Sequence, residues 1–336
     1  MSPSQQADPI HGEFADRTEP FRRELLAHCY RMLGSVDDAE DVLQETYLRA
    51  WRSYGGFEGR SSLRTWLYQI ATNACLTARE QRARRALPSG LGGPGEDRPS
   101  EHGWLQPMPD ALVTGETDDP AVIAAMRDSL RLALIASFQY LPPRQRAVLL
   151  LREVLAFPAD EVARMLGTST VAVKSALQRA RARLSDVAPA YRRIAEPPEP
   201  AARALLDQYI AAFETADASA LERLLRRDAM LELPPSSSWY AGGEAIATAV
   251  AGLGYPGEWR MVPTAANGQP AAAAYRRSFD GADQRGADSA DRRGADSTYQ
   301  AYGIVVLTVS ATGIARIVVF GDPGLFGRFG LPPTWR

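Results

Sequence analysis

A cluster of basic and amide side chains near the middle of the chain has the chemistry needed to bind DNA. Arginine and glutamine can form paired hydrogen bonds with base edges, and cations can neutralise backbone phosphates. These side chains fall within one short stretch, "TSTVAVKSALQRARARL", at residues 168–184. The candidate contact residues are Thr170, Lys174, Ser175, Gln178, Arg179, Arg181 and Arg183.

Two helices must hold these side chains in place. The spacing predicts a first helix over about 159–166 and a turn at Gly167, which tolerates a positive φ. Ser169 or Thr170 can cap the second helix, which buries one apolar stripe. The pair is predicted to form a helix-turn-helix, although a solvated basic face on a helical hairpin is an alternative interpretation. The stripe consists of Val173, Leu177, Ala180 and Leu184.

A second surface is predicted on a helix nearer the N-terminus, "VDDAEDVLQETYLRAWRSY". Its apolar stripe, expected to face the core, consists of Ala39, Val42, Leu43, Thr46, Tyr47, Ala50 and Trp51. The opposite face carries Asp41, Gln44, Glu45 and Leu48. Acids and an amide there could be an ordinary solvent-exposed face. The leucine among them is an exposed apolar residue and favours a docking surface.

A third surface is predicted in "FEGRSSLRTWLYQIATNACLTARE", a loop followed by a helix. An aromatic ring can stack on an unpaired base while neighbouring cations hold the backbone, which is what single-stranded DNA binding requires. We interpret Trp66 as a core residue instead. The candidate contact residues are Phe57, Arg60, Arg64, Asn73 and Arg79.

Composition restricts the class of protein. With 336 residues the chain should form two or three domains, and its net charge of −2 means that any DNA-binding surface arises from local clustering. The polar N-terminus and the lack of a long apolar run predict a cytoplasmic protein that does not contact membranes. Cys29 and Cys75 are isolated and are predicted to be buried free thiols, so we expect no metal and no cofactor.

Shifts in composition divide the chain into seven segments. Stretches rich in glycine and proline predict linkers, and the repeat "GADQRGADSADRRGADS" predicts a flexible surface insertion. The predicted segments are a disordered arm (1–18), a helical domain (19–86), a linker (87–120), a second helical domain with the helix-turn-helix (121–187), a second linker (188–200), an α+β domain (201–322) and a tail (323–336).

Two long motifs resemble the sigma-70 family of RNA polymerase sigma factors. "DDAEDVLQETYLRAW" followed by "SSLRTWLYQIATNACL" resembles region 2, and "LPPRQRAVLLLREVLAFPADEVARMLGTSTVAVKSALQRARARL" resembles region 4. The order of the motifs, with no domain between them, is similar to that of extracytoplasmic-function (ECF) sigma factors. "WLQPMPD" and the long C-terminal extension resemble the actinobacterial, SigG-like subgroup with a fused SnoaL-like domain. The resemblance implies a multidomain protein with two all-α sigma domains and a C-terminal α+β domain.

The resemblance also implies partners, namely core RNA polymerase and promoter DNA. Asp41, Gln44, Glu45 and Leu48, here called the docking face, match the helix face that binds the β′ clamp coiled coil. Region 4 implies contact with the β flap. Phe57, Arg60, Arg64, Asn73 and Arg79, here called the −10 residues, match elements that capture bases of the −10 element. Residues 170–181 match the −35 recognition helix. One departure is that Thr72-Asn73 stands where the family has an Arg-Asn pair.

Residues 201–322 resemble the cone-shaped fold of SnoaL-like proteins, in which a curved sheet wraps a long helix and leaves a pocket. Catalysis in such a pocket needs converging titratable groups. All three histidines, His11, His28 and His102, lie upstream of this domain, so we expect it to regulate and not to catalyse. The tail, predicted to be non-helical, is expected to dock on the sigma regions or on polymerase. Aromatic residues that could line the pocket are Trp239, Tyr240, Tyr255, Trp259 and Phe320.

Two other functions fit parts of the sequence. One is a helix-turn-helix regulator that acts without docking on polymerase. The other is a SnoaL-like enzyme with accessory helices. The sequence identifies neither a small ligand nor a separate anti-sigma factor.

Overall fold

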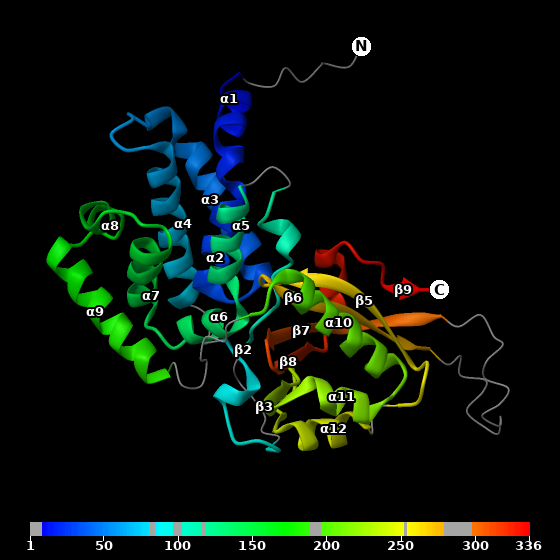
Figure 1. Cartoon of the computed structure of the whole chain (residues 1–336). Helices are drawn as coiled ribbons and strands as arrows, with labels where there is room; N and C mark the ends of the chain where they lie inside the picture. Colours follow the sequence, from blue (N-terminus) through cyan, green and yellow to red (C-terminus); the bar gives the residue numbers. More distant parts are fainter. Residues whose placement is uncertain are drawn as a thin grey trace, which may run out of the picture. The chain divides into compact units, whose positions relative to one another are not determined.

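The chain divides into two compact units (Figure 1). The first unit comprises residues 1–85 and 112–193, and the second comprises residues 86–111 and 194–336. Within the described residues no helix is long and apolar enough to cross a membrane. The Gly-Ala-Asp repeat lies outside the described residues. The computed structural model describes residues 9–80, 85–96, 103–115, 119–187, 196–251, 254–278 and 298–336.

The first half of the helical unit is a bundle in which α2, α3 and α4 pack against one another. The side chain of Ser35 caps α3 by accepting a hydrogen bond from the Asp38 N–H. Cys29 and Cys75 are buried free thiols in this bundle, as predicted. The helices are α1 (Pro9–Thr18), α2 (Arg22–Leu33), α3 (Val36–Ser53) and α4 (Leu63–Glu80).

The second half of the helical unit ends in the predicted helix-turn-helix. Gly167 adopts a φ of 59° in the turn between α8 and α9. Ser169 caps α9, because its Oγ accepts a hydrogen bond from the Ala172 N–H at 3.2 Å. The elements are α5 (Pro120–Leu130), α6 (Leu132–Phe138), α7 (Pro143–Leu149), a π-helical turn (Leu150–Val154), α8 (Ala159–Met165) and α9 (Thr170–Val187).

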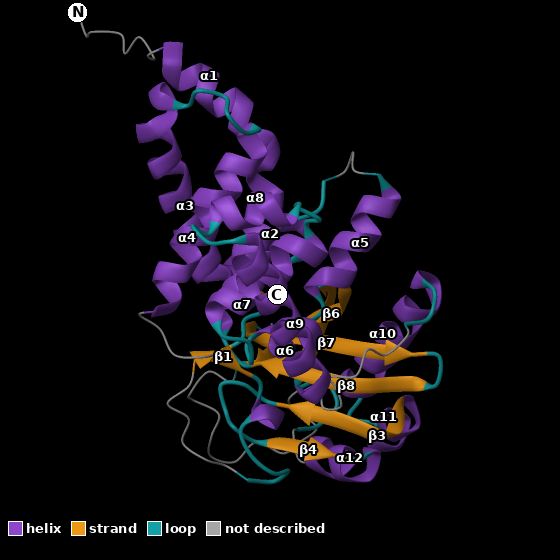
Figure 2. Cartoon of the chain, turned by 90° about the vertical axis from the view of Figure 1, so that its left-hand side faces the viewer, coloured by secondary structure: helices purple, strands orange, loops and turns teal. Residues whose placement is uncertain are grey.

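The second unit is built on a twisted sheet, drawn in orange in Figure 2. Its strands lie in the order β4-β3-β8-β7-β6-β5, and β3 and β8 form a parallel pair in this otherwise antiparallel arrangement. The helix α10 packs across β5, β6 and β7. This is the predicted α+β domain. The elements are α10 (Glu199–Glu214), α11 (Ala218–Leu224), β3 (Leu225–Glu232), β4 (Trp239–Ala241), α12 (Gly243–Ala251), β5 (Trp259–Ala266), β6 (Gln269–Arg277), β7 (Tyr299–Ser310) and β8 (Gly313–Phe320).

Part of the stretch predicted as the first linker belongs to this second unit. Two short strands, β1 (Arg85–Ala86) and β2 (Gly103–Trp104), pair with each other. Leu87, Leu105 and Met108 are buried, which explains why the segment does not behave as a purely polar linker. The described parts of this segment, residues 86–96 and 103–111, are therefore structured.

The predicted disordered arm is partly helical. Residues Pro9–Thr18 form α1, and Phe14 is buried with its ring edge-on to Tyr54, at a centroid distance of 5.1 Å. Arg17 donates a hydrogen bond to the Tyr54 hydroxyl at 2.7 Å. The prediction of disorder for the whole arm was wrong because it ignored this aromatic anchor.

The C-terminal tail docks on its own domain, which corrects the expectation that it would dock on the sigma regions or on polymerase. It forms a 3-10 helix (Pro323–Phe329) and a short strand, β9 (Thr334–Trp335), that pairs with the start of β7. Phe326 and Trp335 both contact the ring of Tyr275, at 4.9 and 5.8 Å between centroids. The tail was expected to be non-helical, and the 3-10 helix over Pro323–Phe329 corrects that expectation.

Candidate functional site

The docking face lies along one side of α3 and is open to solvent. Asp41 and Gln44 are exposed, and Leu48 is 49% exposed. Glu45 is half-buried and forms an ion pair with Arg49 at 2.6 Å. The face therefore combines acidic and amide groups with an apolar side chain that water can reach.

Trp51 extends this apolar patch, although its place in the sequence stripe predicted a core position. It follows Leu48 by three residues, so both lie on the same side of the helix. Trp51 is 45% exposed, which corrects the prediction. The signal that could have identified it is its spacing from Leu48.

The −10 residues that precede and begin α4 are held by internal contacts. Arg64 forms a two-point contact with the carboxylate of Glu24, at 3.0 and 2.9 Å. Phe57 is half-buried and lies against Trp66, with 4.9 Å between centroids. Trp66 is itself half-buried, so it supports Phe57 and is not the core residue that we expected. These contacts fix the orientation of the first turn of α4 and of the preceding loop.

The remaining −10 residues differ in exposure. Arg60 is exposed and pairs with Glu58 in the loop. Asn73 is exposed on the outer side of α4, and Arg79 is half-buried. Cationic and amide side chains are thus spaced from the loop before α4 to the last turn of this helix.

Thr72 faces the interior of the bundle, where it cannot reach a phosphate. It is fully buried, and its Oγ1 lies 2.9 Å from Nε2 of His28. Burial, with smaller effects from Arg31 and Arg64, lowers the pKa of His28 to about 3, so this histidine is neutral at physiological pH. Asn73 is the exposed member of the Thr72-Asn73 pair, and its side-chain amide donates to the Met165 carbonyl at 3.4 Å.

The recognition-helix candidates lie on the outer surface of α9. Val173 and Ala180 of the predicted stripe are buried. The opposite side of α9 therefore faces the solvent. Arg181 pairs with Glu153 at 2.5 Å, while Arg179 donates to the hydroxyl of Ser175. Thr170, Lys174, Gln178, Arg179, Arg181 and Arg183 are exposed, and Ser175 is half-buried.

Val171 is a candidate contact that the sequence analysis missed. It lies in the first turn of α9 and is 75% exposed. An apolar side chain at the start of a recognition helix can contact a thymine methyl group. Its position outside the stripe of Val173 and Ala180 is the sequence signal that could have identified it.

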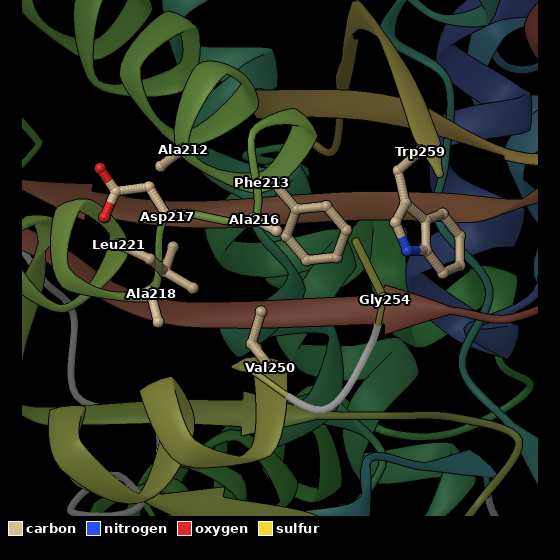
Figure 3. A pocket seen from close by; sticks show the side chains of 9 residues that line it. All are labelled: Ala212, Phe213, Ala216, Asp217, Ala218, Leu221, Val250, Gly254 and Trp259. Atoms are coloured by element: carbon tan, nitrogen blue, oxygen red, sulfur yellow. The ribbon is translucent and has the colours of Figure 1, made fainter. Parts of the chain in front are cut away.

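The second unit has a pocket between the end of α10, α11, α12 and β5 (Figure 3). Of the five aromatic residues predicted to line it, Trp259 does so, whereas Phe320 is buried and the indole N–H of Trp239 donates to the Gly92 carbonyl. Among the described residues that line the pocket, Asp217 is the one with a titratable side chain, and its carboxylate caps α11 at the end of the pocket opposite Trp259 (Figure 3).

A metal centre is not found in the described part of the chain either. No group of three or more His, Cys, Asp or Glu side chains among those residues is arranged to hold a metal ion.

Comparisons with known proteins match both helical halves. The family model for "Sigma-70 region 2" matches residues 18–85, and the one for "Sigma-70, region 4" matches residues 131–184. The chain is 49% identical to the ECF RNA polymerase sigma factor SigG of Mycobacterium tuberculosis, over 98% of the chain and 86% of that protein. It is 31% identical to the ECF RNA polymerase sigma factor SigJ of the same species, over 62% of the chain and 61% of that protein.

A solved structure shares the fold. The crystal structure of Mycobacterium tuberculosis SigJ aligns with a TM-score of 0.59 at 22% identity, covering 95% of the chain and all of that protein's chain.

Proposed function

The chain belongs to the ECF RNA polymerase sigma factors, and on this premise we propose that α3 binds core polymerase while α4 and α9 read promoter DNA. A sigma factor is a transcription-initiation factor and not an enzyme. It works where RNA polymerase does, so we place the protein in the cytoplasm.

The observation that carries the polymerase contact is the exposure of Leu48 and Trp51 beside Asp41 and Gln44. Large apolar groups with a polar rim are typical of a protein interface. A helix-turn-helix regulator that works without polymerase docking has no use for this face. Capture of core RNA polymerase on the immobilised protein tests the assignment, because such a regulator would not retain it.

The two DNA-binding surfaces have different chemistry. The exposed polar and basic groups of α9, with Val171, suit the base edges and phosphates of a major groove. Phe57 and the α4 side chains suit unpaired bases and the backbone beside them. We assign α9 to the −35 element and the −10 residues to the −10 element.

The second unit is proposed to regulate the sigma regions through the chain that joins them. The Ser89 N–H donates to the buried carboxylate of Glu232 at 3.0 Å, and Arg316 lies 3.4 Å from the other carboxylate oxygen. The Gly268 N–H donates to Asp110 at 2.8 Å. Because residues 86–111 connect region 2 with region 4, a sheet that binds them restricts the path between the two regions.

This regulatory role is favoured over catalysis by the pocket itself. Among the described residues its lining offers one titratable side chain, that of Asp217, and Asp207 on α10 is exposed and does not line the pocket. Deleting residues 200–336 tests the role, since promoter output should then differ from that of the full chain. Turnover of a ketosteroid by the full chain would favour the enzyme alternative.

A further inference from the structure

We propose that Lys174 on α9 is an acylation site, through which activated acyl groups lower the affinity of the recognition helix for DNA. The inference rests on the proposed function, because it assigns a mode of regulation to the −35 surface. The substrate class is a small acyl phosphate or acyl thioester, which transfers its acyl group to an amine.

Lys174 is the one lysine in the sequence. The chain contains 38 lysine and arginine residues, and all of them except Lys174 are arginines. The guanidinium of arginine stays protonated, whereas the ε-amine of lysine is the group that acyl donors modify. Acylation of a side-chain amine can therefore occur at a single position of this sequence, and that position lies within the surface assigned to the −35 element.

The amine of Lys174 is open to a reagent. The residue is exposed and lies about one turn after the start of α9. Arg181 on the same helix is held by its ion pair with Glu153 at 2.5 Å. Lys174, by contrast, forms no hydrogen bond or ion pair with any residue that the structure describes. An acyl donor thus reaches this amine without breaking a contact among those residues.

The same amine belongs to the side of α9 that is assigned to DNA. Val171 precedes Lys174 by three residues and Gln178 follows it by four, so the three side chains share one face of the helix. Val171 is 75% exposed, and Gln178 is also exposed. The N-terminal residues of a recognition helix are the ones that reach base edges. Because helical side chains lean towards the N-terminus, the charge of Lys174 lies over this part of α9.

The transfer is a substitution at a carbonyl carbon and involves no redox step. The neutral ε-amine attacks the acyl carbonyl carbon, and an N–C bond forms while the C–O bond of an acyl phosphate or the C–S bond of a thioester breaks. One amine proton passes to the leaving phosphate or thiolate. The product is a neutral amide, which cannot neutralise a DNA phosphate.

Loss of this charge should weaken DNA binding and spare the contact with polymerase. Each phosphate that a cation neutralises contributes about 0.9 to the slope of log affinity against log salt. The acylated chain should therefore show a salt slope smaller by about one and an affinity for a −35 duplex lower by about threefold or more. The docking face on α3 carries no lysine, so affinity for core polymerase should not change.

The first experiment measures modification of the site. The full chain is incubated with acetyl phosphate in one arm, with acetyl-coenzyme A in a second and with acetate as the blank. Trypsin cuts after Arg164, Lys174 and Arg179, and acetylation blocks the cut at Lys174, so the mass of the peptide 165–179 reports occupancy. We expect this peptide in at least one donor arm, which identifies the donor class. An unmodified Lys174 in both arms overturns the proposal.

The second experiment measures the consequence on a homogeneous protein, produced with Nε-acetyl-lysine incorporated at position 174. The probe is a duplex carrying the −35 sequence of a promoter that the chain transcribes with core polymerase. The acetylated chain should bind it more weakly and with a smaller salt slope, and Lys174→Gln, which is also neutral, should behave alike. Affinity for core polymerase, measured on the same preparations, should be unchanged. Equal duplex affinity and equal salt slope for acetylated and unmodified chains overturn the proposal.

The matched control is Lys174→Arg, which keeps the positive charge and removes the amine. Each protein is compared with its own untreated sample. Treatment with the active donor should lower the duplex affinity of the wild type and leave that of Lys174→Arg at its untreated value. An equal loss in both proteins would place the effect at another group, such as the N-terminal amine, and would overturn the assignment. An unmodified wild type that does not bind the −35 duplex at all would instead refute the proposed function of α9, and this mode of regulation with it.

Discussion

Asn267 and Met108 hold each other through two reciprocal hydrogen bonds. The Met108 N–H donates to Asn267 Oδ1 at 2.9 Å, and the Asn267 N–H donates to the Met108 carbonyl at 2.8 Å. Asn267 is buried with a φ of 58°, a conformation that asparagine adopts more readily than most residues. This pair joins the chain between regions 2 and 4 to the turn between β5 and β6.

Removing the side chain of Asn267 should release that chain. Asn267→Gly tolerates the positive φ but leaves the buried Met108 N–H without its acceptor, at a cost of about 1–3 kcal/mol. We expect faster proteolytic cleavage within residues 86–111 and at least a twofold rise in promoter output at limiting core polymerase. Asn267→Asp keeps an acceptor oxygen and should resemble the wild type. If the glycine variant shows the same cleavage rate and the same promoter output as the wild type, the hydrogen bonds between Asn267 and Met108 have no regulatory role.

The docking face should determine affinity for core polymerase. Leu48→Ala with Trp51→Ala removes the exposed apolar patch and should weaken core binding about 30-fold, the effect of losing about 2 kcal/mol. Asp41→Lys with Glu45→Lys should also weaken it through charge reversal. Helicity should change little, because these side chains are exposed or half-buried. Asp16→Lys, on the exposed side of α1, is the control, and titration with labelled core polymerase is the measurement. Full affinity in both double variants would exclude this face.

The side chains of α9 should separate into base readers and phosphate binders. Gln178→Ala or Arg179→Ala should cost about 1–3 kcal/mol and relax specificity at one promoter position. Arg183→Ala, nearer the end of the helix, should weaken all sequences alike and reduce the salt slope by about one. Binding to a promoter library at several salt concentrations distinguishes the two classes. Identical profiles for Arg179→Ala and Arg183→Ala would refute the division.

His28 should make the stability of the helical unit depend on pH. The pKa of His28 is about 3 in the folded chain, whereas the ordinary value for a solvated histidine is 6.5. Between pH 3 and pH 6.5 the unfolded chain therefore binds a proton at His28 that the folded chain does not bind. The free energy of unfolding should therefore fall as pH drops below about 6.5, by up to about 1.4 kcal/mol per pH unit from this residue. Burial keeps the imidazole neutral, with smaller contributions from the positive charges of Arg31 and Arg64, and the ring of Tyr68 packs against it.

The check is urea unfolding of the wild type and of His28→Gln from about pH 7 to about pH 5. Glutamine can keep a hydrogen bond to Thr72 and does not titrate. The variant should show a flatter decline over this range. Parallel declines would mean that His28 is protonated in the folded chain.

Local patterns predicted the helical half of the protein well. The stripe through Val173 and Ala180, the turn at Gly167 and the cap at Ser169 are all encoded within one short stretch. Each depends on neighbours within a few residues, so the sequence carries the information directly. Trp51 was misplaced because helical periodicity gives a direction on the helix but not how far the neighbouring helices cover it.

Long-range contacts explain what the sequence could not predict. The hydrogen bond between Met108 and Asn267 joins residues 159 positions apart, and no local sequence pattern predicts it. The strand β6 contains four consecutive alanines, Ala271–Ala274, whose intrinsic preference is helical. They are buried between β5 and β7, where sheet pairing overrides that preference. The contact of the Arg64 guanidinium with the Phe157 ring likewise joins residues that are far apart in sequence.

The most direct test of the central claim is run-off transcription by core RNA polymerase on a promoter library, with and without the purified chain. The account predicts that core polymerase alone gives no specific transcripts, and that the added chain produces discrete transcripts downstream of one shared pair of −35 and −10 sequences. Absence of any chain-dependent transcript, from a protein that still binds duplex DNA on its own, would contradict it.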